Sequence, residues 1–289
     1  MRAILAEKPG GPEQLAIKNV PIPELQPHEI LIKVKAAAVN QLDLLQREGK
    51  HPPPPGTTEI LGVDVSGTVE EIGGKVSKWK RGDKVMSVLN GGGYAEYTAV
   101  HEEIAMSIPA HLSFEEAAAI PEVFLTAYQV LFFIADIQPG NWVLIHAGAS
   151  GVGTAAIQLV KEIEANSVIT AGSNEKISLC LDLGAYAGFN YHEGPFSEKA
   201  IHATKGHGFN VIIDPIGASY WEQNMQALAP EGTLILLATM GGRFVEKMNL
   251  GTLMQKWASV TGTTLRSRPQ NYKIRLVKSF EAFCRPRFE

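Results

Sequence analysis

A glycine-rich turn carries the residues of this sequence that are best suited to bind a ligand. Residues 141–147 read as a buried strand, because β-branched and aromatic side chains dominate them. Apolar residues recur at helical spacing from Gly151 onward, so we expect a helix to begin there. Gly148, Gly151 and Gly153 crowd this junction. Because free N–H groups and the positive end of a helix dipole point outward at such a turn, it predicts an anion site.

The turn departs from the G-x-G-x-x-G pattern that is typical of dinucleotide-binding proteins. The three positions fall on Gly148, Ser150 and Gly153, so a serine replaces the middle glycine. Glycines allow the backbone to touch a pyrophosphate and the helix to pack closely on the strand. The alternative interpretation is an ordinary tight turn between a strand and a helix. If the first interpretation holds, the residues that contact the cofactor are Gly148, Ser150, Gly151, Val152 and Gly153.

The elements after the turn would place it at the edge of a parallel sheet. Strand-like runs alternate with helical runs, which is typical of βαβ units. Six strands that begin at the glycine turn predict a doubly wound sheet of the Rossmann type, and this favours the dinucleotide interpretation. The predicted strands are residues 141–147, 167–172, 187–191, 210–217, 232–239 and 258–265.

The N-terminal part of the chain has a different pattern, in which short strands are separated by Gly, Asp and Pro. It predicts a mostly β, barrel-like domain with one short helix at 41–49. A long helical pattern follows at 113–135 and is interrupted at Pro121. We expect this segment to cross an interdomain cleft, where a cofactor and a substrate would meet. The predicted N-terminal strands are residues 29–40, 60–73, 82–88 and 92–100.

Residues 170–176 bear on the choice between NADPH and NADH. In an NAD site, an acidic residue at the end of the second strand accepts a hydrogen bond from the ribose 2′-hydroxyl. Here the strand ends in Gly172 and Ser173, and Lys176 follows within one helical turn. A hydroxyl, a cation and a helix N-terminus suit a 2′-phosphate, which favours NADPH. The alternatives are a plain helix cap for Ser173 and a solvated lysine, and Glu175 could turn inward.

The composition indicates a globular protein and argues against several functional classes. The 289 residues are 45% hydrophobic and 19% charged, and the net charge of −4 gives no basic field for nucleic acid. No apolar run approaches the length of a membrane span, and the N-terminal segment lacks the core of a signal peptide. Cys180 and Cys284 lie far apart, which suits a reducing compartment such as the cytoplasm.

Five stretches stand in a characteristic order: AAAVNQLDLLQREG, ILGVDVSG, WKRGDKV, AAAIP and HAGASGVGTAAIQL. In this order and spacing they resemble the medium-chain dehydrogenase/reductase superfamily, and within it the zinc-free quinone oxidoreductases. The further stretches KPGGPE, PPPPG, LTAYQVL, GFNY and SYWEQN resemble most of all their p53-inducible group. The resemblance implies a GroES-like catalytic domain over residues 1–122 and a Rossmann NADPH-binding domain over 123–265. A C-terminal helix over 266–289 would follow, and the chain would form a homodimer.

The resemblance also implies roles for individual residues. Asn40 would lie beside the nicotinamide ribose, while Lys176 and Tyr191 would flank the phosphate on the adenine side of the cofactor. Gly241 would contact the cofactor as well. His51 stands where similar proteins have a tyrosine in the substrate cleft, so it could donate a proton to a reduced quinone oxygen. The alternative is a loop histidine that makes no contact with the substrate.

The sequence lacks the zinc ligands of the metal-dependent members of this superfamily. Those members carry a cysteine and a GHE motif where this chain has Asn40 and, at residues 62–64, GVD. Catalytic zinc needs three protein ligands, and valine cannot provide one. The histidines are scattered without ligand spacing. We therefore expect no metal.

These features together predict an NADPH-dependent quinone reductase that acts on a small-molecule quinone in the cytoplasm. The resemblance implies that it could transfer single electrons and generate reactive oxygen species in stress or apoptosis. One alternative is an enoyl reductase on the same scaffold, and another is an NADPH-binding protein without catalytic activity. No nucleic acid or membrane partner is expected.

The C-terminal segment departs from the family pattern. Leu276, Val277, Phe280 and Phe283 form one face of a predicted helix, and Pro286 would stop it. Family members continue with strands that return to the N-terminal domain, and no such strand is recognisable here. We expect the shortened end to leave strand edges of that domain exposed and to lower activity.

Overall fold

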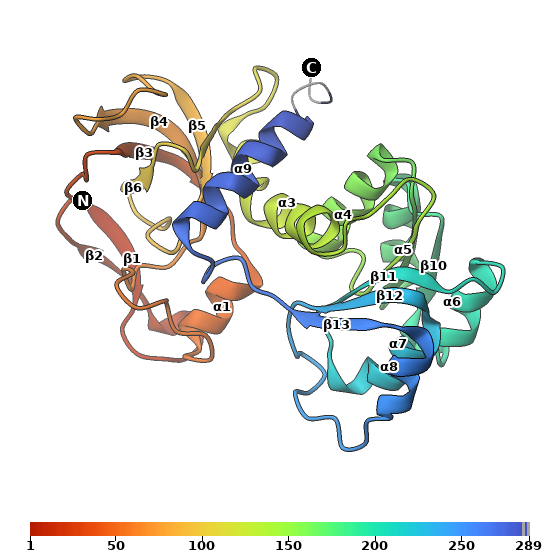
Figure 1. The fold of residues 1–289 in the computed structure, drawn as a ribbon. Helices are drawn as coiled ribbons and strands as arrows, with labels where there is room; N and C mark the ends of the chain where they lie inside the picture. The colour runs from red at the N-terminus through yellow and green to blue at the C-terminus, as the bar shows by residue number, and fades with distance from the viewer. Residues whose placement is uncertain (285–286, 288–289) are drawn as a thin grey trace. The chain divides into compact units, whose positions relative to one another are not determined.

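The computed structural model of the chain describes residues 1–284 and residue 287. It divides into two compact units, shown in Figure 1. Unit 1 comprises residues 1–125 together with the chain from residue 265 onward, and unit 2 comprises residues 126–264. Unit 1 contains antiparallel sheets and unit 2 contains one parallel sheet. The predicted α/β fold class is therefore confirmed.

Unit 1 is built on two antiparallel sheets. In one, β1 (Arg2–Ala6) pairs with β2 (Leu15–Asn19), and in the other five strands lie in the order β6-β3-β4-β5-β7. Ile30 and Ile32 are fully buried in the second sheet, and because they lie two residues apart they share a face. The five strands are β3 (Glu29–Ala37), β4 (Asp64–Ile72), β5 (Lys84–Val88), β6 (Tyr97–His101) and β7 (Ala105–Ser107).

The helices of unit 1 follow the predicted pattern. The predicted helical stretch is interrupted at Pro121, because α2 ends at Ala118 and α3 begins at the proline. The C-terminal helix buries Leu276, Val277 and Phe280, which confirms the predicted helix face. Pro286, which was expected to stop this helix, lies outside the described residues. The bounds are η1 (Pro12–Gln14), α1 (Gln41–Arg47), α2 (Phe114–Ala118), α3 (Pro121–Tyr128) and α9 (Gln270–Cys284). Helix α3 passes into unit 2 at Thr126 and continues there as the π-helical turn η2 (Gln129–Ile134).

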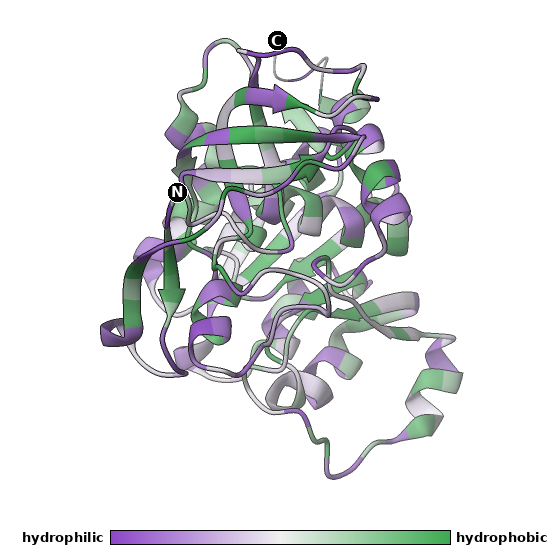
Figure 2. Ribbon diagram, turned by 90° about the vertical axis from the view of Figure 1, so that its left-hand side faces the viewer, coloured by the Kyte–Doolittle hydropathy of each residue, from purple (hydrophilic) through white to green (hydrophobic). Residues whose placement is uncertain are grey.

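Unit 2 contains a six-stranded sheet in the order β10-β9-β8-β11-β12-β13, in which all neighbouring strands are parallel. The adjacent residues Leu144 and Ile145 point to opposite faces of the sheet, and both are fully buried, so both faces are covered. Figure 2 shows hydrophobic segments, in green, in strands and in helices alike. The strands are β8 (Trp142–Ile145), β9 (Asn166–Ala171), β10 (Ala187–Asn190), β11 (Phe209–Asp214), β12 (Leu228–Leu236) and β13 (Ser259–Gly262).

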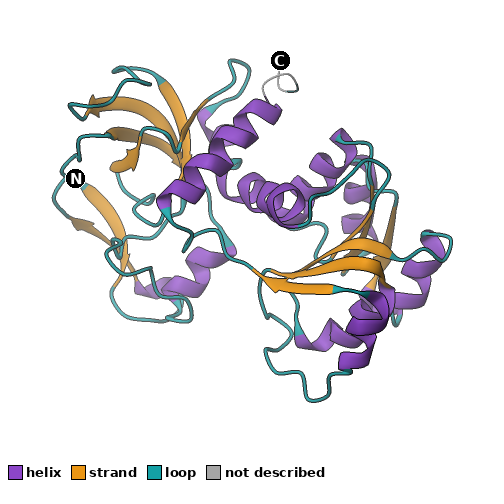
Figure 3. Ribbon diagram, viewed as in Figure 1, coloured by secondary structure: helices purple, strands orange, loops and turns teal. Residues whose placement is uncertain are grey.

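Helices connect successive strands of unit 2, as Figure 3 shows. This alternation confirms the predicted doubly wound parallel sheet. The connecting elements are α4 (Gly151–Glu162), α5 (Asn174–Asp182), η3 (Tyr191–Glu193), α6 (Ser197–Ala203), η4 (Ala218–Tyr220), α7 (Trp221–Ala227) and α8 (Leu250–Lys256).

Among the described strands and α-helices, four have no counterpart among the sequence predictions: β1, β2, β7 and α8. Four of the five residues of β2 are exposed, so the strand lacks the alternation that marks a half-buried strand. Helix α8 has only seven residues, too few for its apolar spacing at Leu250, Leu253 and Met254 to stand out in the sequence. Strand β7 has only three residues, too few for a periodic pattern.

Candidate cofactor and substrate site

The glycine turn of unit 2 forms the predicted strand, turn and helix. Strand β8 ends at Ile145, two residues before the end of the predicted strand 141–147, and helix α4 begins at Gly151 as predicted. Ser150 is the N-cap of this helix, and its Oγ accepts a hydrogen bond from the Gly153 N–H at 3.1 Å. The N–H groups of Gly151 and Val152 have no acceptor within residues 1–284. The serine that departs from the glycine pattern therefore caps the helix, while two N–H groups remain for an anion.

Close packing explains two of the three glycines. A Cβ atom on Gly153 would lie 2.5 Å from the carbonyl oxygen of Gly148 and 2.6 Å from that of Ala147. A Cβ atom on Gly148 would lie 2.6 Å from the Cβ of Ile169 in the neighbouring strand β9. These distances are all far shorter than a normal contact, so a larger residue at Gly153 or Gly148 would push the neighbouring elements apart. The structure thus forms the close cradle that a pyrophosphate site requires.

The residues expected at the 2′-phosphate lie together at the end of β9. Ser173 caps α5, with its Oγ accepting from the Lys176 N–H at 3.4 Å, and the Lys176 side chain is exposed. Tyr191 lies over Gly172, because a Cβ there would meet the tyrosine hydroxyl at 2.5 Å. A hydrogen bond from Ser173 is the main cause that lowers the pKa of Glu175. The cluster therefore contains a carboxylate beside the hydroxyl and the cation.

All these residues follow strands of one sheet, and the carboxyl ends of parallel strands meet at the same edge. The chain runs outward from β8 to β9 and β10, and then returns to β11 on the other side of β8. The direction of strand order therefore reverses between β8 and β11, which is where ligands bind in open α/β sheets. Gly241, in the loop after β12, donates its N–H to the carbonyl oxygen of Ile216 at 2.7 Å, so it lies beside the end of β11.

A buried polar network surrounds His146, which directly follows β8 and precedes the glycine turn. The spacing of its members along the sequence gave no sign of this network. His146 Nε2 lies 2.7 Å from Asn224 Oδ1, and its Nδ1 lies 2.9 Å from Thr170 Oγ1. Asn224 Nδ2 donates to Asp214 Oδ2 at 2.9 Å, so its Oδ1 accepts from the histidine. His146 therefore carries its proton on Nε2 and accepts from Thr170 at Nδ1. Burial lowers the pKa of His146 to about 4, so the ring is neutral.

The predicted residue Asn40 lies in unit 1 as the N-cap of α1. Its Nδ2 donates to Asp64 Oδ2 at 2.9 Å, and its backbone N–H donates to Asp43 Oδ2 at 2.9 Å. The other Asp64 oxygen accepts from the backbone N–H of Glu122 at 2.8 Å. Tyr94 Oη also donates to Asp43 Oδ2, at 3.0 Å. Asn40 is thus part of a buried network of carboxylates in unit 1.

His51 is half-buried, and it lies close enough to a buried arginine for their charges to interact. Burial lowers the pKa of His51, and the positive charge of Arg266 lowers it further. Arg266 donates from Nε to the Asn90 carbonyl oxygen at 2.6 Å and from Nη2 to Gln46 Oε1 at 2.7 Å. Its buried Nη1 has no hydrogen-bond partner in the described part of the chain. The sequence offered no signal for this arginine beyond its place after β13.

The side chains at the positions where metal-dependent members of the superfamily carry their zinc ligands do not fit a zinc site. Both oxygens of Asp64 accept hydrogen bonds from N–H groups, one of them from Asn40, and Val63 offers no ligand atom. Over residues 1–284 and 287, no group of three His, Cys, Asp or Glu side chains is arranged to hold a metal ion. We therefore assign no role to zinc in the chemistry of this chain.

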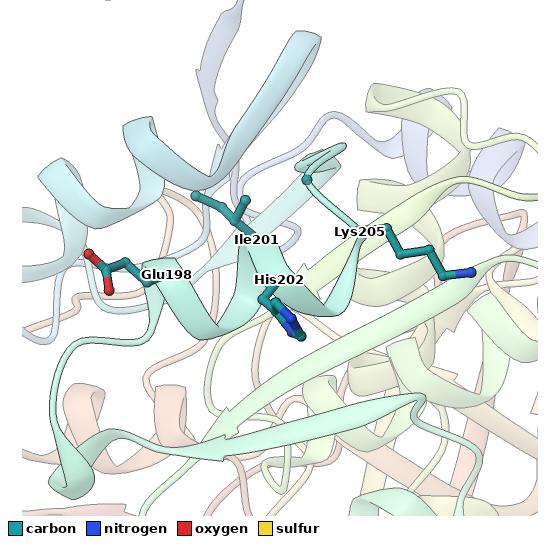
Figure 4. A pocket seen from close by; sticks show the side chains of 5 residues that line it. Glu198, Ile201, His202 and Lys205 are labelled. Atoms are coloured by element: carbon teal, nitrogen blue, oxygen red, sulfur yellow. The ribbon is translucent and has the colours of Figure 1, made fainter.

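A surface hollow on unit 2 is lined by residues on and after α6, namely Glu198, Ile201, His202, Lys205 and Gly206. In Figure 4 the polar ends of Glu198, His202 and Lys205 point in different directions, so they do not converge on a ligand.

No helix in the described part of the chain is long and apolar enough to cross a membrane.

Two family models match the chain. The alcohol dehydrogenase GroES-like domain matches residues 26–110, and the zinc-binding dehydrogenase family matches residues 151–281. Quinone oxidoreductase of Lama guanicoe is 34% identical over 271 residues, which cover 92% of this chain and 81% of that protein. The GroES-like character expected for the N-terminal domain is therefore confirmed.

Solved structures of related enzymes share the fold over nearly the whole chain. Escherichia coli quinone oxidoreductase complexed with NADPH matches with a TM-score of 0.85 at 31% identity, covering 98% of this chain and 87% of that one. The CurK enoyl reductase matches with a TM-score of 0.86 at 26% identity, covering 99% of this chain and 88% of that one. From its sequence and its fold, the chain belongs to the quinone oxidoreductase branch of the medium-chain dehydrogenase/reductase superfamily.

Proposed function

We propose that this protein is an NADPH-dependent quinone reductase that works without zinc. The observation that carries the proposal is the carboxyl edge of the parallel sheet in unit 2. There, a helix N-terminus with two open N–H groups follows β8, and Ser173, Lys176 and Tyr191 gather at the ends of β9 and β10. The related E. coli structure, which contains NADPH, supports this choice of cofactor.

The residues of unit 2 would hold the cofactor by its phosphates. The open N–H groups of Gly151 and Val152 suit the pyrophosphate, Gly148 and Gly153 allow its close approach, and Gly241 lies along the same edge of the sheet. Lys176 supplies a positive charge for the 2′-phosphate, and Tyr191 and Ser173 supply hydroxyl groups. Because Glu175 takes up the Ser173 hydroxyl, it competes with the phosphate for that donor.

When it is bound, NADPH supplies a hydride, and the protein's own task is to orient the reactants and manage protons. Asn40 is fixed at its backbone and its side chain, which suits a residue that orients the nicotinamide ribose. The reduced quinone oxygens require protons. His51 is our candidate donor in its protonated form, which gives a proton to the quinone oxygen and returns to neutral imidazole. Burial and the charge of Arg266 lower the pKa of His51, so this form is the minor one near pH 7 and the stronger acid.

The test assays the purified protein with two different acceptors and, in a third arm, without any acceptor. We expect oxidation of NADPH in the presence of an ortho-quinone and little oxidation of NADH. Oxygen uptake with superoxide formation in the same assay would indicate single-electron transfer. Cofactor binding without turnover of any acceptor would refute the proposal and favour a non-catalytic NADPH-binding protein.

A second candidate function is reduction of a carbon–carbon double bond. The likeness to the CurK enoyl reductase over 99% of the chain favours it. A 2-enoyl thioester is therefore the second acceptor in the assay, and a reaction without added acceptor is the third arm. Faster turnover of the thioester than of every quinone would replace the first proposal by this one.

A further inference from the structure

Asn40 is held at two points by buried carboxyl groups. The side chain donates to Asp64 and the backbone N–H donates to Asp43, each at 2.9 Å. The two aspartates are 0% and 2% exposed, respectively. Two polar groups out of contact with water are thus engaged by one residue at the start of α1.

These carboxyl groups are unfavourable for folding where they lie. Burial raises the pKa of both groups, and the nearby charge of Glu122 raises that of Asp64 further. Among the described residues, no lysine, arginine or histidine forms an ion pair with either aspartate. Asp43 caps α1 and also accepts from Gly62 and Tyr94, whereas Asp64, in the described part of the chain, accepts only from Asn40 Nδ2 and the Glu122 N–H. Asp64 is therefore the carboxyl group whose burial a local structural role explains least.

The hydrogen bonds of Asp64 define which end of the Asn40 amide faces it. The backbone N–H of Glu122 can only donate, so Asp64 Oδ1 accepts. In its ionised form Asp64 can only accept at Oδ2, so it meets the Nδ2 end of the Asn40 amide; a protonated Asp64 would donate from Oδ2 and meet the Oδ1 end instead. Asp64 thereby selects one of the two orientations of the carboxamide.

We propose that Asp64 is a positioning residue that sets the orientation of the Asn40 carboxamide, and with it the donor and acceptor that Asn40 presents to the nicotinamide side of the cofactor. The proposal rests on the proposed function, because it assumes that NADPH binds. Asp64 itself touches no substrate in this scheme and acts only through Asn40.

The substitution Asp64→Asn tests this role with little change in volume. The new amide can accept from the Glu122 N–H only by turning its NH2 group toward Asn40. Two NH2 groups cannot bond to each other, so Asn40 must invert or lose its hydrogen bond. We expect the Kd for NADPH to rise about tenfold, which corresponds to about 1.4 kcal/mol. The Kd for adenosine 2′,5′-bisphosphate, which lacks the nicotinamide ribose, is expected to stay unchanged.

A double-mutant cycle separates positioning from a structural effect. In the Asn40→Ala background, Asp64→Asn is expected to have no further effect on NADPH binding, because the residue through which it acts is gone. Ser66→Ala is the matched control, since Ser66 is equally buried in β4 but bonds to the Phe114 carbonyl oxygen. This control is expected to keep the wild-type affinity for NADPH.

Several outcomes would overturn the inference. If Asp64→Asn weakens the binding of NADPH and of the bisphosphate equally, its effect is structural. The same holds if Asp64→Asn weakens NADPH binding as much in the Asn40→Ala background as in the wild-type protein. If Asp64→Asn does not fold, the side-chain NH2 signals of Asn40 in the ¹⁵N-labelled wild-type protein decide the question. Slow exchange of these NH2 hydrogens with solvent supports the hydrogen bond from Asn40 to Asp64, and rapid exchange refutes it. Wild-type protein that does not bind NADPH would refute the proposed function itself, and this inference with it.

Discussion

Protonation of the buried His146 is expected to weaken unit 2 as the pH falls. In the folded protein the pKa of His146 is about 4, whereas the ordinary histidine pKa of 6.5 applies to the unfolded chain. A lowered histidine pKa means that the unfolded chain binds more protons between these values. Stability is therefore fully present above pH 6.5 and is lost as the pH falls toward 4. For these two pKa values, the linkage relation gives a loss of about 2 kcal/mol between pH 8 and pH 5.

The structure explains why this ring resists protonation. Its Nδ1 already accepts from Thr170, and Phe196 and Tyr220 pack edge-on against it with ring centroids 4.7 and 4.8 Å away. A second proton on the ring would place two hydrogens between Nδ1 and the hydroxyl of Thr170 unless that hydroxyl turns away. The charge would also lie in a site without solvent.

Urea unfolding at pH 8 and pH 5, followed by circular dichroism, measures the effect. His146→Leu is expected to lower stability at pH 8, because it leaves Asn224 without its donor, and to remove about 2 kcal/mol of the pH dependence. Thr170→Val is the matched control, since it removes a hydrogen bond but keeps the titrating ring, and it should retain most of the pH dependence. The same pH dependence in wild type and His146→Leu would show that the histidine does not titrate as reasoned.

Three further predictions concern the cofactor edge of unit 2. Gly153→Ala should weaken the binding of NADPH and NADH alike by about tenfold or more, the order expected for overpacking, because its Cβ would lie 2.5 Å from the Gly148 oxygen. Calorimetric titration measures both affinities. Gly262→Ala is the control and should bind normally, because its Cβ would meet only the Leu236 oxygen, at 4.0 Å. Lys176→Glu should raise the Kd for NADPH about tenfold and spare NADH, and equal losses for both cofactors would contradict the role at the 2′-phosphate. Glu175→Gln should strengthen NADPH binding a few-fold, because it removes a negative charge beside Ser173; unchanged affinity would mean that this carboxylate does not oppose the phosphate.

The sequence alone determined the local structure of the cofactor edge. The start of α4 at Gly151 and the end of β8 just before the turn follow from patterns that lie within a few residues. Helix capping and hydrophobic periodicity act over a single turn or strand, so they are readable without a partner. The alternation of strands and helices was sufficient for the parallel sheet, because parallel strands need crossover connections.

Only the tertiary structure decided which distant side chains meet. Asn40 bonds to Asp64 across 24 positions, and His146 bonds to Asn224 across 78. No periodicity within one segment reports such a pair, because the contact depends on strand register and on how a helix lies on its sheet. The ionisation of these groups was equally hidden, since burial and neighbouring charges set a pKa and neither is a property of residue order. Sequence patterns thus located the glycine turn, and tertiary packing created the buried networks around His146 and Asn40.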